Sequence, residues 1–586
     1  MNEMKKIKNK ATAIDTPFFV SGQGTNKQTI GKEIFNVLPT SWERKYIALF
    51  ALIILFSQTL FAQQMQPIIK ATSSKVDVKD GEIYQKAVWN LSPEANPDIY
   101  YPLEPKSEKR ITFYTDIDSV SFNFVPGNIY DFIIVLNNID TCHTQISTVK
   151  PVKEVKTNTV SKNPIESEML KQDFTIFREA LQKEHAGLYR YKSKIELNKL
   201  FDSCFVALNH PMPELEFAKS IMFLISSIED GHTASNLPHL LMDYYTENEK
   251  MFPVYVFFIN TKAYVLCSRI VELPAEVEIL SIDNNPIAEI RKELLKYLPS
   301  DGKIETKKNQ TFNNGAFCFL YKWIFGNKNS FIVRYKTTQG EIKTTTVNAE
   351  LVKDFECDNG NGLSNKKDLQ LDFPQDNTAL LTLKTFDDNR LAGKQNFKDF
   401  LDASFKEINS KKISNLIIDL RGNAGGTDVY GALLYAYLAN KPFKYFSTIE
   451  STTSKIQLKE NPLLDIQQPQ NNRFNGKVLF LINGLCFSTT ADFCAIAKSN
   501  NRGKFIGEET GGGYYGNTSG QITTTELPNS KIIIKIPKFK YVNDVAKAKF
   551  TDRGIIPNFT ILPTIEEVIL HKDAQLNFAL KLAKVE

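Results

Sequence analysis

The chain has 586 residues, of which 42% are hydrophobic and 23% are charged. This composition supports sizeable cores and excludes a wholly disordered chain, a collagen and a coiled coil, and at roughly 150 residues per domain the length predicts about four domains. Most of the net charge of +5 comes from residues 1–46, which hold eight Lys and Arg against four Asp and Glu. Because the remainder is nearly neutral, we expect no nucleic-acid partner.

Residues 1–62 predict a leader followed by an export signal. Arg44 and Lys45 precede an uncharged apolar run from Ile47 to Ala62, which is the layout of a secretory signal peptide, with cleavage after Ala62 as the preferred reading. An uncleaved anchor is the alternative, although a comfortable membrane span needs about 20 residues. We therefore expect an exported protein, periplasmic or associated with the cell envelope, with membrane association through residues 47–62 if the run is retained.

The seven cysteines are too few for a disulfide-dense scaffold. None forms a C-x-x-C pair, so a zinc ribbon is not expected. Because their number is odd, at least one thiol stays free or pairs outside the chain.

Two regions precede the middle of the chain. Residues 80–148 predict a small β domain, with short apolar or alternating stretches at 111–117, 119–125 and 130–138. A polar stretch from Val149 to Pro164 lacks periodicity and predicts a linker. Residues 165–245 predict helices from apolar residues at three- and four-residue spacing, with Gly231 as a helix stop.

The second half of the chain changes style between two regions. Residues 250–350 predict strands with a helix at 287–298, as in a small α+β sheet domain. Residues 378–586 contain short, continuous apolar runs, each followed by a helical stretch. This alternation is typical of a parallel sheet covered on both faces.

The turn from Asp419 to Asp428 follows one of these buried strands. Gly422, Gly425 and Gly426 allow backbone conformations that other residues avoid. Ligands in such sheets lie at the carboxyl ends of strands, where exposed amides suit an anion or a developing oxyanion. A tight turn without a ligand is the alternative, and the absence of a following lysine argues against a phosphate loop.

The turn from Ile482 to Phe493 places Ser488 between a strand and a helix. A serine at this position is commonly an N-cap. As a nucleophile it would gain from the helix dipole and from the amide of Thr489. No histidine or lysine lies in the helix that follows, so a base must come from elsewhere in the chain.

Among six histidines, His232 is the best candidate base because it follows a helix end and a glycine. The alternative is a surface or capping histidine. His232 and His239 lack an H-E-x-x-H pattern, so no metal site is predicted. Asp552, near Gly554 and Pro557, could orient the histidine as the third member of a triad; a turn-capping aspartate is the alternative.

The motifs DLRGNAGG, CFSTTADF, IGEETGGG and TDRGIIPNFTI occur in this order. Together they resemble the core of the C-terminal-processing, or tail-specific, serine peptidases. The resemblance covers 378–586 well and extends more loosely to the IEDGHT stretch. It implies a multidomain α/β protein, with a ClpP/crotonase-like parallel-sheet core at 378–586, a helical cap at 165–245, a PDZ-like domain at 250–350 and the N-terminal all-β domain at 80–148.

The family has two catalytic styles. One uses a lysine 25 residues after the serine, but the corresponding residue here is Gly513. The other resembles the tricorn core, which takes a histidine from the helical region and a late acid. His232, Ser488 and Asp552 match this plan in order, although the family usually has glutamate last and tricorn has a serine where this chain has Gly231.

The resemblance implies acyl transfer without a cofactor or a metal. His232 would take the proton of Ser488, amides near Gly425 or Gly426 and on Thr489 would bind the oxyanion, and Asp552 would hold the imidazole. The substrate would be a peptide or an unfolded protein.

The stretch ILSIDNNPI is similar to a PDZ segment, but no clear carboxylate-binding loop is visible, so the PDZ-like domain would be degenerate. A carrier for peptides or apolar ligands, like the retinoid-binding repeats that share this core, is the alternative function.

Overall fold

The computed structural model describes residues 164–355 and 367–585, together with six strands between Val76 and Ser147. The chain divides into two compact units, Met1–Asn158 and Thr159–Glu586. The predicted leader and apolar run at 1–62 lie outside the described residues. Within the described part, no helix is both long enough and apolar enough to cross a membrane.

The described strands of the first unit form two small antiparallel sheets. One pairs β1 (Val76–Lys79) with β2 (Glu82–Gln85), and the other has the order β4-β3-β5-β6. Its strands are β3 (Pro97–Pro102), β4 (Arg110–Tyr114), β5 (Ile129–Leu136) and β6 (Asp140–Ser147). The stretches predicted as strands at 111–117 and 130–138 overlap β4 and β5, whereas the one at 119–125 lies outside the described residues.

The second unit begins with helices, as the apolar spacing predicts. They are α4 (Ser167–Glu184), α5 (Lys194–Ala207), α6 (Glu214–Ile228) and α7 (His239–Asn248). The expected stop at Gly231 is wrong by two residues, because α6 ends at Ile228 and Glu229 takes the left-handed conformation (φ 62°). Gly231 lies instead where a side chain would collide with Lys307 and Phe487.

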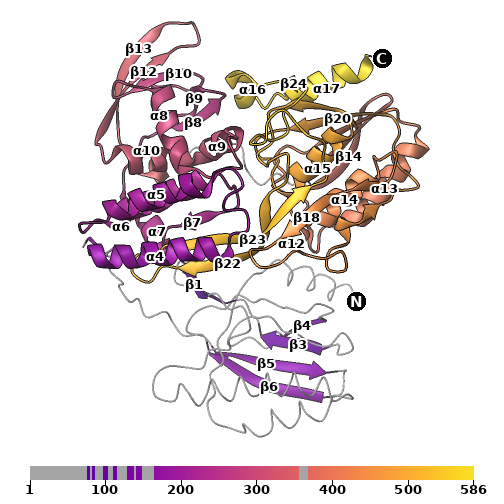
Figure 1. Ribbon diagram of the computed structural model, residues 1–586, viewed down its shortest axis with the longest axis horizontal. Helices are drawn as coiled ribbons and strands as arrows, with labels where there is room; N and C mark the ends of the chain where they lie inside the picture. Colours follow the sequence, from indigo (N-terminus) through magenta and orange to yellow (C-terminus); the bar gives the residue numbers. More distant parts are fainter. Residues whose placement is uncertain are drawn as a thin grey trace. The chain divides into compact units, whose positions relative to one another are not determined.

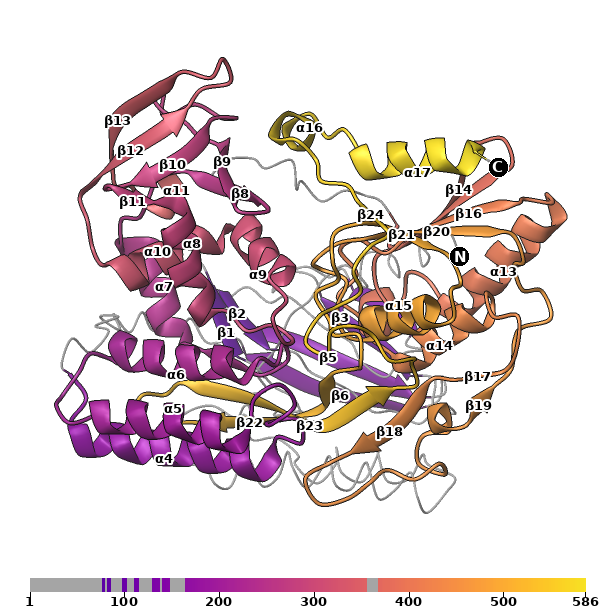
Figure 2. The same ribbon diagram turned by 45° about the horizontal axis from the view of Figure 1, so that its top comes forward.

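Helices α4 to α6 share a hydrophobic core with residues that come late in the chain. Leu527, Ile532 and Ile534, from the hairpin of β22 (Thr518–Glu526) and β23 (Ile533–Asn543), are buried against Phe174 and Ile221. Figures 1 and 2 both show this long hairpin running beside α4 and α6. The short strand β7 (Ala234–Asn236) also pairs with β23. Because β7 begins two residues after His232, this pairing fixes the loop of residues 229–233, called the histidine loop below, to the C-terminal part of the chain.

Residues 251–355 form an antiparallel sheet packed against helices, with the strand order β13-β12-β10-β9-β8. The strands are β8 (Tyr255–Ile259), β9 (Lys262–Cys267), β10 (Glu278–Ile282), β11 (Asn285–Pro286), β12 (Ser330–Lys336) and β13 (Ile342–Asn348). The helical segments are α8 (Ile287–Leu294), η1 (Leu295–Tyr297), α9 (Thr306–Thr311), the π-helical turn η2 (Phe312–Ala316), α10 (Phe317–Phe325) and α11 (Val352–Phe355). The predicted helix at 287–298 corresponds to α8 and η1, whereas the pattern gave no warning of α9 and α10.

The C-terminal region contains the expected parallel sheet, in the order β14-β15-β16-β20-β21-β24. Its strands are β14 (Leu369–Gln375), β15 (Thr378–Leu383), β16 (Asn415–Asp419), β20 (Lys477–Ile482), β21 (Lys504–Gly507) and β24 (Phe559–Thr560). All neighbouring strands run parallel except β14, which is antiparallel at the edge. Continuous apolar runs form these strands because both faces of the sheet are covered.

Residues that alternate along β16 reach two different cores. Leu416 and Ile418 belong to the core that also contains Phe405 and Ala495, whereas Ile417 belongs to the core that contains Ala579. Figure 1 accordingly shows α13, α14 and α15 on one side of the sheet and α17 on the other. These helices are α13 (Phe397–Ser410), α14 (Asp428–Ala436), α15 (Thr489–Ser499) and α17 (Ala574–Lys584). The smaller elements are α12 (Asp388–Leu391), β17 (Phe443–Lys444), β18 (Phe446–Glu450), η3 (Pro462–Leu464), β19 (Ile466–Gln467) and α16 (Ile565–Ile569).

Candidate active site

Ser488 lies at the N-terminus of α15 in an uncommon conformation. Its φ of 54° and ψ of −132° lie outside the regions favoured by non-glycine residues, and its hydroxyl does not cap the helix. The N-cap interpretation therefore loses its main physical support, because a capping serine is retained for that hydrogen bond. A strained serine between a buried strand and a helix is instead typical of a nucleophile held out from the sheet.

The turn from Asp419 to Asp428, called the glycine turn below, packs directly against Ser488. A Cβ on Gly425 would lie 2.7 Å from Ser488 Cβ and 3.0 Å from the Thr489 nitrogen, and the φ of Gly425 is 102°. The Phe487 amide donates to the Asn423 carbonyl, and Asn483 Oδ1 accepts from the Gly422 amide, so the two turns are also bonded to each other.

The predicted oxyanion donors differ in availability. The Gly425 amide donates to Asn423 Oδ1 at 2.9 Å and is therefore occupied. The amides of Gly426 and Thr489 donate to no other group among the described residues. The structure thus leaves two of the three predicted donors, one from each turn, free to bind a developing negative charge.

His232 lies beside the turn from Ile482 to Phe493, called the serine turn below. Its ring centroid is 4.3 Å from that of Phe487, the residue before Ser488, with 30° between the ring planes. The Nδ1 atom is buried and has no hydrogen-bond partner among the residues described, and no hydrogen bond joins the ring to Ser488. The structure thus brings the histidine loop against the serine turn but does not assemble a bonded pair, a gap that is common in the absence of substrate.

The charge on His232 is set by its surroundings. Burial and, to a smaller extent, Lys307 lower the pKa of His232 to about 4, although Asp230 acts in the opposite direction. At neutral pH the ring is therefore uncharged and able to accept a proton.

Asp230 organises the backbone of the histidine loop. Its Oδ1 accepts hydrogen bonds from the amides of His232 and Thr233 and from the Thr233 hydroxyl, at 2.9 to 3.0 Å. His185 Nε2 lies 2.7 Å from the Thr233 hydroxyl, and His185 Nδ1 accepts from the Gly187 amide. Burial would raise the pKa of Asp230, but the two histidines and the Thr233 bonds keep it below its ordinary value. Asp230 and Thr233 thus support the loop through its backbone.

Asp552 is bound elsewhere than predicted. Its carboxylate pairs with Lys303 Nζ at 3.0 Å, and its carbonyl accepts from the Lys303 amide. The hydrogen bond with Lys303 is the main cause that lowers the pKa of Asp552. Since His232 Nδ1 has no partner in the described part of the chain, the structure does not join Asp552 to the histidine.

Two groups that the sequence analysis missed join the histidine loop to the peptidase core, Asp301 through Gly513 and Lys307 through Phe487. Asp301 is buried and accepts from the Gly231 amide at 2.7 Å and from the Gly513 amide at 3.1 Å. Lys307, on α9, lies over the Phe487 ring. Both residues come from the region assigned to the PDZ-like domain, where no local motif indicated a link to the peptidase core.

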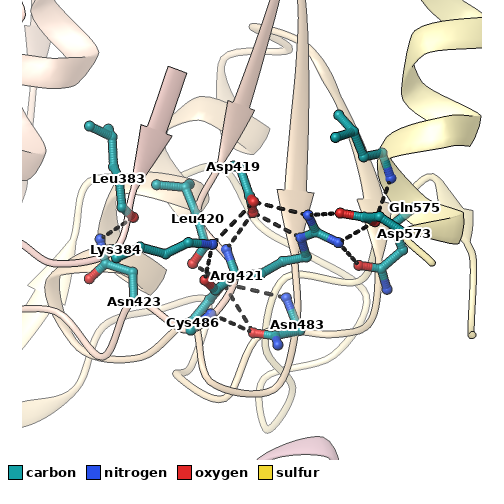
Figure 3. A network of polar contacts seen from close by, with 12 residues as sticks. Leu383, Lys384, Asp419, Leu420, Arg421, Asn423, Asn483, Cys486, Asp573 and Gln575 are labelled. Atoms are coloured by element: carbon teal, nitrogen blue, oxygen red, sulfur yellow. Dashed lines mark hydrogen bonds and ion pairs between the residues drawn. The ribbon is translucent and has the colours of Figure 1, made fainter. Parts of the chain in front are cut away.

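An ion-pair network fixes the start of the glycine turn (Figure 3). The Arg421 guanidinium lies between the carboxylates of Asp419 and Asp573, with Nη1 and Nη2 each 2.7 Å from an oxygen of Asp573. Lys384 donates to Asp419 and to the Arg421 carbonyl, both at 3.1 Å. This network ties the ends of β15 and β16 to the C-terminal helix.

A cavity of about 400 Å³ opens beside β8, lined by residues that include Phe257, Gln310, Arg421 and Glu508. None of the predicted catalytic or oxyanion residues is among the described residues that line it. The cavity is therefore not the site of the predicted chemistry.

Ser488, His232 and the glycine turn together suggest a class of protein. A strained serine at a helix N-terminus, two free amides from adjacent turns and a neutral histidine against the serine turn are the elements of serine-dependent acyl transfer.

Comparisons with known proteins find a family match over part of the chain. Residues 377–561 match the model of peptidase family S41, and no curated protein matches the sequence. The chain therefore carries a peptidase family S41 core and is a serine-type peptidase by class.

Solved structures agree with this fold at low sequence identity. The chain is similar to mature CPAF, with a TM-score of 0.52 and 13% identity over 72% of this chain and 97% of that one. The s499a mutant of CPAF gives a TM-score of 0.52 at 12% identity, covering 72% and 97%. A putative peptidase from Parabacteroides merdae ATCC 43184 gives a TM-score of 0.39 at 13% identity, covering 71% and 97%, a value too low to support an argument.

Proposed function

We propose that this protein is an exported serine peptidase in which Ser488 is the nucleophile and His232 is the general base. The observation that carries the proposal is the backbone of Ser488, which has a positive φ and a hydroxyl that caps nothing, within a peptidase family S41 core. Such strain persists only where the surrounding structure maintains it, and it is concentrated at functional sites.

The reaction begins when His232 removes the proton of the Ser488 hydroxyl. Ser488 Oγ then attacks a peptide carbonyl, and the resulting oxyanion is bound by the amides of Gly426 and Thr489. Each such donor contributes on the order of 3 kcal/mol to the transition state. The protonated histidine gives its proton to the leaving amine, and a water molecule releases the acyl group by the reverse sequence.

The closeness of the His232 ring to Phe487 supports the choice of base. The proposal gives Asp552 no direct bond to His232, because Lys303 binds its carboxylate. The substrate is a peptide or an unfolded protein, because the acyl-transfer site of a peptidase acts on peptide bonds.

The apolar run at 47–62 supports an extracytoplasmic location, because it has the layout of a signal peptide.

Labelling with a serine-directed fluorophosphonate tests the proposed reaction without knowledge of the natural substrate. We expect the wild-type chain to be labelled at Ser488, Ser488→Ala to lose the label, and His232→Ala to be labelled at least about 100-fold more slowly. Ser499→Ala is the matched control, since Ser499 lies at the other end of α15 and its hydroxyl accepts from the Ala546 amide.

Lactacystin offers a second probe, because mature CPAF has been solved in complex with it. Labelling that survives Ser488→Ala would assign the nucleophile to another serine. A wild-type chain that is never labelled but binds apolar ligands tightly would favour the carrier function instead.

A further inference from the structure

Lys307, on α9, contacts both halves of the proposed active site. Its Nζ donates to the Gly231 carbonyl at 2.8 Å and lies 3.4 Å from the centroid of the Phe487 ring. Gly231 immediately precedes His232, and Phe487 immediately precedes Ser488. One ammonium group therefore bridges the loop that carries the base and the turn that carries the nucleophile.

The packing around this ammonium is too close for a side chain at position 231. A Cβ on Gly231 would lie 2.7 Å from Lys307 Nζ and 2.7 Å from Phe487 Cε2. The φ of Gly231 is not in the left-handed region, so the glycine is required for space and not for its conformation. Lys307 thus occupies a volume that the histidine loop leaves open for it.

Two buried carboxylates keep the ammonium charged. Burial lowers the pKa of Lys307 to about 8, while Asp301 and Asp230 act in the opposite direction. At neutral pH most molecules therefore carry a positive charge at this position. A cation over an aromatic face is attracted by the ring, and more strongly where water is excluded.

We propose that Lys307 is a positioning residue for the peptidase reaction, whose ammonium holds the His232 loop against the Ser488 turn and disfavours a second positive charge on the imidazole. This inference rests on the proposed function, because it concerns the same serine and histidine. It assigns α9 a part in the active site, and Figures 1 and 2 show α9 between the sheet of β8 to β13 and the peptidase core.

The charged and titratable groups around His232 come from three segments. Asp230 lies on the same loop, His185 and Arg190 lie in the segment that follows α4, and Lys307 lies on α9. Among the three cationic or titratable neighbours, Lys307 has the largest effect in lowering the pKa of His232. Removing its charge should therefore make the imidazole easier to protonate, with Asp230 unopposed by this ammonium.

The test is a titration of His232 in the full-length chain, followed by the NMR signal of ¹³Cε1-labelled histidine and assigned with His232→Gln. Lys307→Gln removes the charge but can still donate a hydrogen bond to the Gly231 carbonyl, and Lys307→Arg keeps the charge. We expect the pKa of His232 to rise by about 1 or more in the glutamine variant and to stay near the wild-type value in the arginine variant.

Lys308→Met is the matched control. Lys308 also has a pKa lowered to about 8 by burial, but its Nζ donates to the Leu295 carbonyl and lies 3.5 Å from Ser226 Oγ. Its loss removes the same charge one residue along α9 and should leave the His232 titration unchanged. An equal shift in both lysine variants would show a general electrostatic effect and would overturn the specific role of Lys307.

The rate of fluorophosphonate labelling gives the second readout. We expect the labelling rate of Lys307→Gln to be about twofold lower at pH 5 than at neutral pH, because His232 becomes protonated. A loss of rate that is the same at every pH would be separate from this effect. If the pKa of His232 is unchanged in the glutamine variant, the inference is contradicted, whatever the labelling shows. If the wild-type chain is not labelled, the proposed peptidase reaction is contradicted, whatever the titration shows.

Discussion

Gly422 and Gly425 lie in the same turn, and both have positive φ, at 80° and 102°. They differ in their surroundings, because a Cβ on Gly422 would meet no atom within 4 Å, whereas one on Gly425 would collide with Ser488 Cβ at 2.7 Å. At the residue scale, this pair separates the cost of backbone strain from the cost of displacing the nucleophile.

We expect Gly425→Ala to reduce the rate of fluorophosphonate labelling at Ser488 by about 100-fold, since displacements near 1 Å at a reacting group have effects of this size. Gly422→Ala should lose about 1–2 kcal/mol of unfolding free energy through backbone strain but keep most of the labelling rate. Equal labelling rates in the two variants would contradict the proposed contact between the turns.

Asp552 distinguishes a triad member from a surface ion pair. Its carboxylate is partly exposed and is bound by Lys303, and exposed pairs of this kind contribute about 0–1 kcal/mol. We therefore expect Asp552→Asn to be labelled within about fivefold of the wild-type rate.

An acid that holds the catalytic imidazole would behave differently, because its amide variant loses activity by about 10⁴-fold. Lys303→Met provides the control, since it breaks the same ion pair from the other side. A large loss in Asp552→Asn alone would mean that Asp552 reaches His232 when substrate binds.

The limits of sequence reasoning are also clearest among these residues. The roles of Ser488 and of the glycines could be predicted from local strand-turn-helix patterns, which are visible in the sequence. His232 was proposed from its place after a helix and supported by a family resemblance. Asp301 and Lys307 had no such signal, because their importance comes from contacts with residues distant in sequence, and a buried lysine looks like a surface lysine until the fold is known.

At the scale of elements, the same contrast separates strands from short helices. β16 and β20 were predictable from continuous apolar runs, because burial on both faces leaves that pattern. α9 and α10 were not, because the π-helical turn at 312–316, with Gly315 at φ 94°, interrupts their periodicity. α9 contacts the peptidase core through Lys307 and Gln310, so one of the missed elements is also one that matters for the site.

The edge strand β8 shows what this helical segment does to the sheet. The Phe258 amide donates to Asn313 Oδ1 at 2.6 Å, and Asn313 Nδ2 donates to the Phe258 carbonyl at 3.1 Å. Asn309 Nδ2 donates to the Asn260 carbonyl just beyond the strand. An added peptide strand would need these backbone groups, so this part of the edge is already occupied by the chain itself.

We expect Asn313→Ala to lower the unfolding free energy by about 1–3 kcal/mol, since it leaves a donor and an acceptor of the edge strand without partners. The neighbouring Asn314 is exposed, so Asn314→Ala should change the unfolding free energy by no more than about 0.5 kcal/mol. Chemical denaturation of the two variants measures the difference, and equal midpoints would show that the Asn313 bonds contribute nothing.

At the scale of the whole molecule, the second unit is joined through contacts between its beginning and its end. β7 pairs with β23, and the helices α4 to α6 share a core with the β22–β23 hairpin. The sequence predicted separate regions at 165–245 and 378–586 but could not show this pairing, because a three-residue strand carries too little pattern. The proposed active site depends on it, since His232 and Ser488 come from the two ends of this arrangement.

The C-terminal helix is fastened to the core by charge as well as by apolar contact. Asp573 accepts two hydrogen bonds from Arg421 and also caps α17 by accepting from the Leu576 amide at 2.9 Å. Asp573→Asn separates these roles, because asparagine remains a good N-cap but cannot form the same charged pair. Because Asp573 is partly exposed and solvent screens the pair, we expect this variant to lose about 1 kcal/mol of unfolding free energy at pH 7.

The pH dependence of that loss identifies its cause. Although burial acts against it, the hydrogen bond and charge of Arg421 keep the pKa of Asp573 below its ordinary value. A carboxyl with a depressed pKa in the folded protein stabilises it above the unfolded pKa, near 3.9, and this stabilisation is lost as the pH falls through the folded value. The difference between wild type and Asp573→Asn should therefore shrink below about pH 4. Urea denaturation at pH 7 and at acid pH measures it, with Glu566→Gln as the control for an exposed pair with Lys572. A difference that persisted undiminished in acid would assign the loss to packing or capping and not to the Arg421 ion pair.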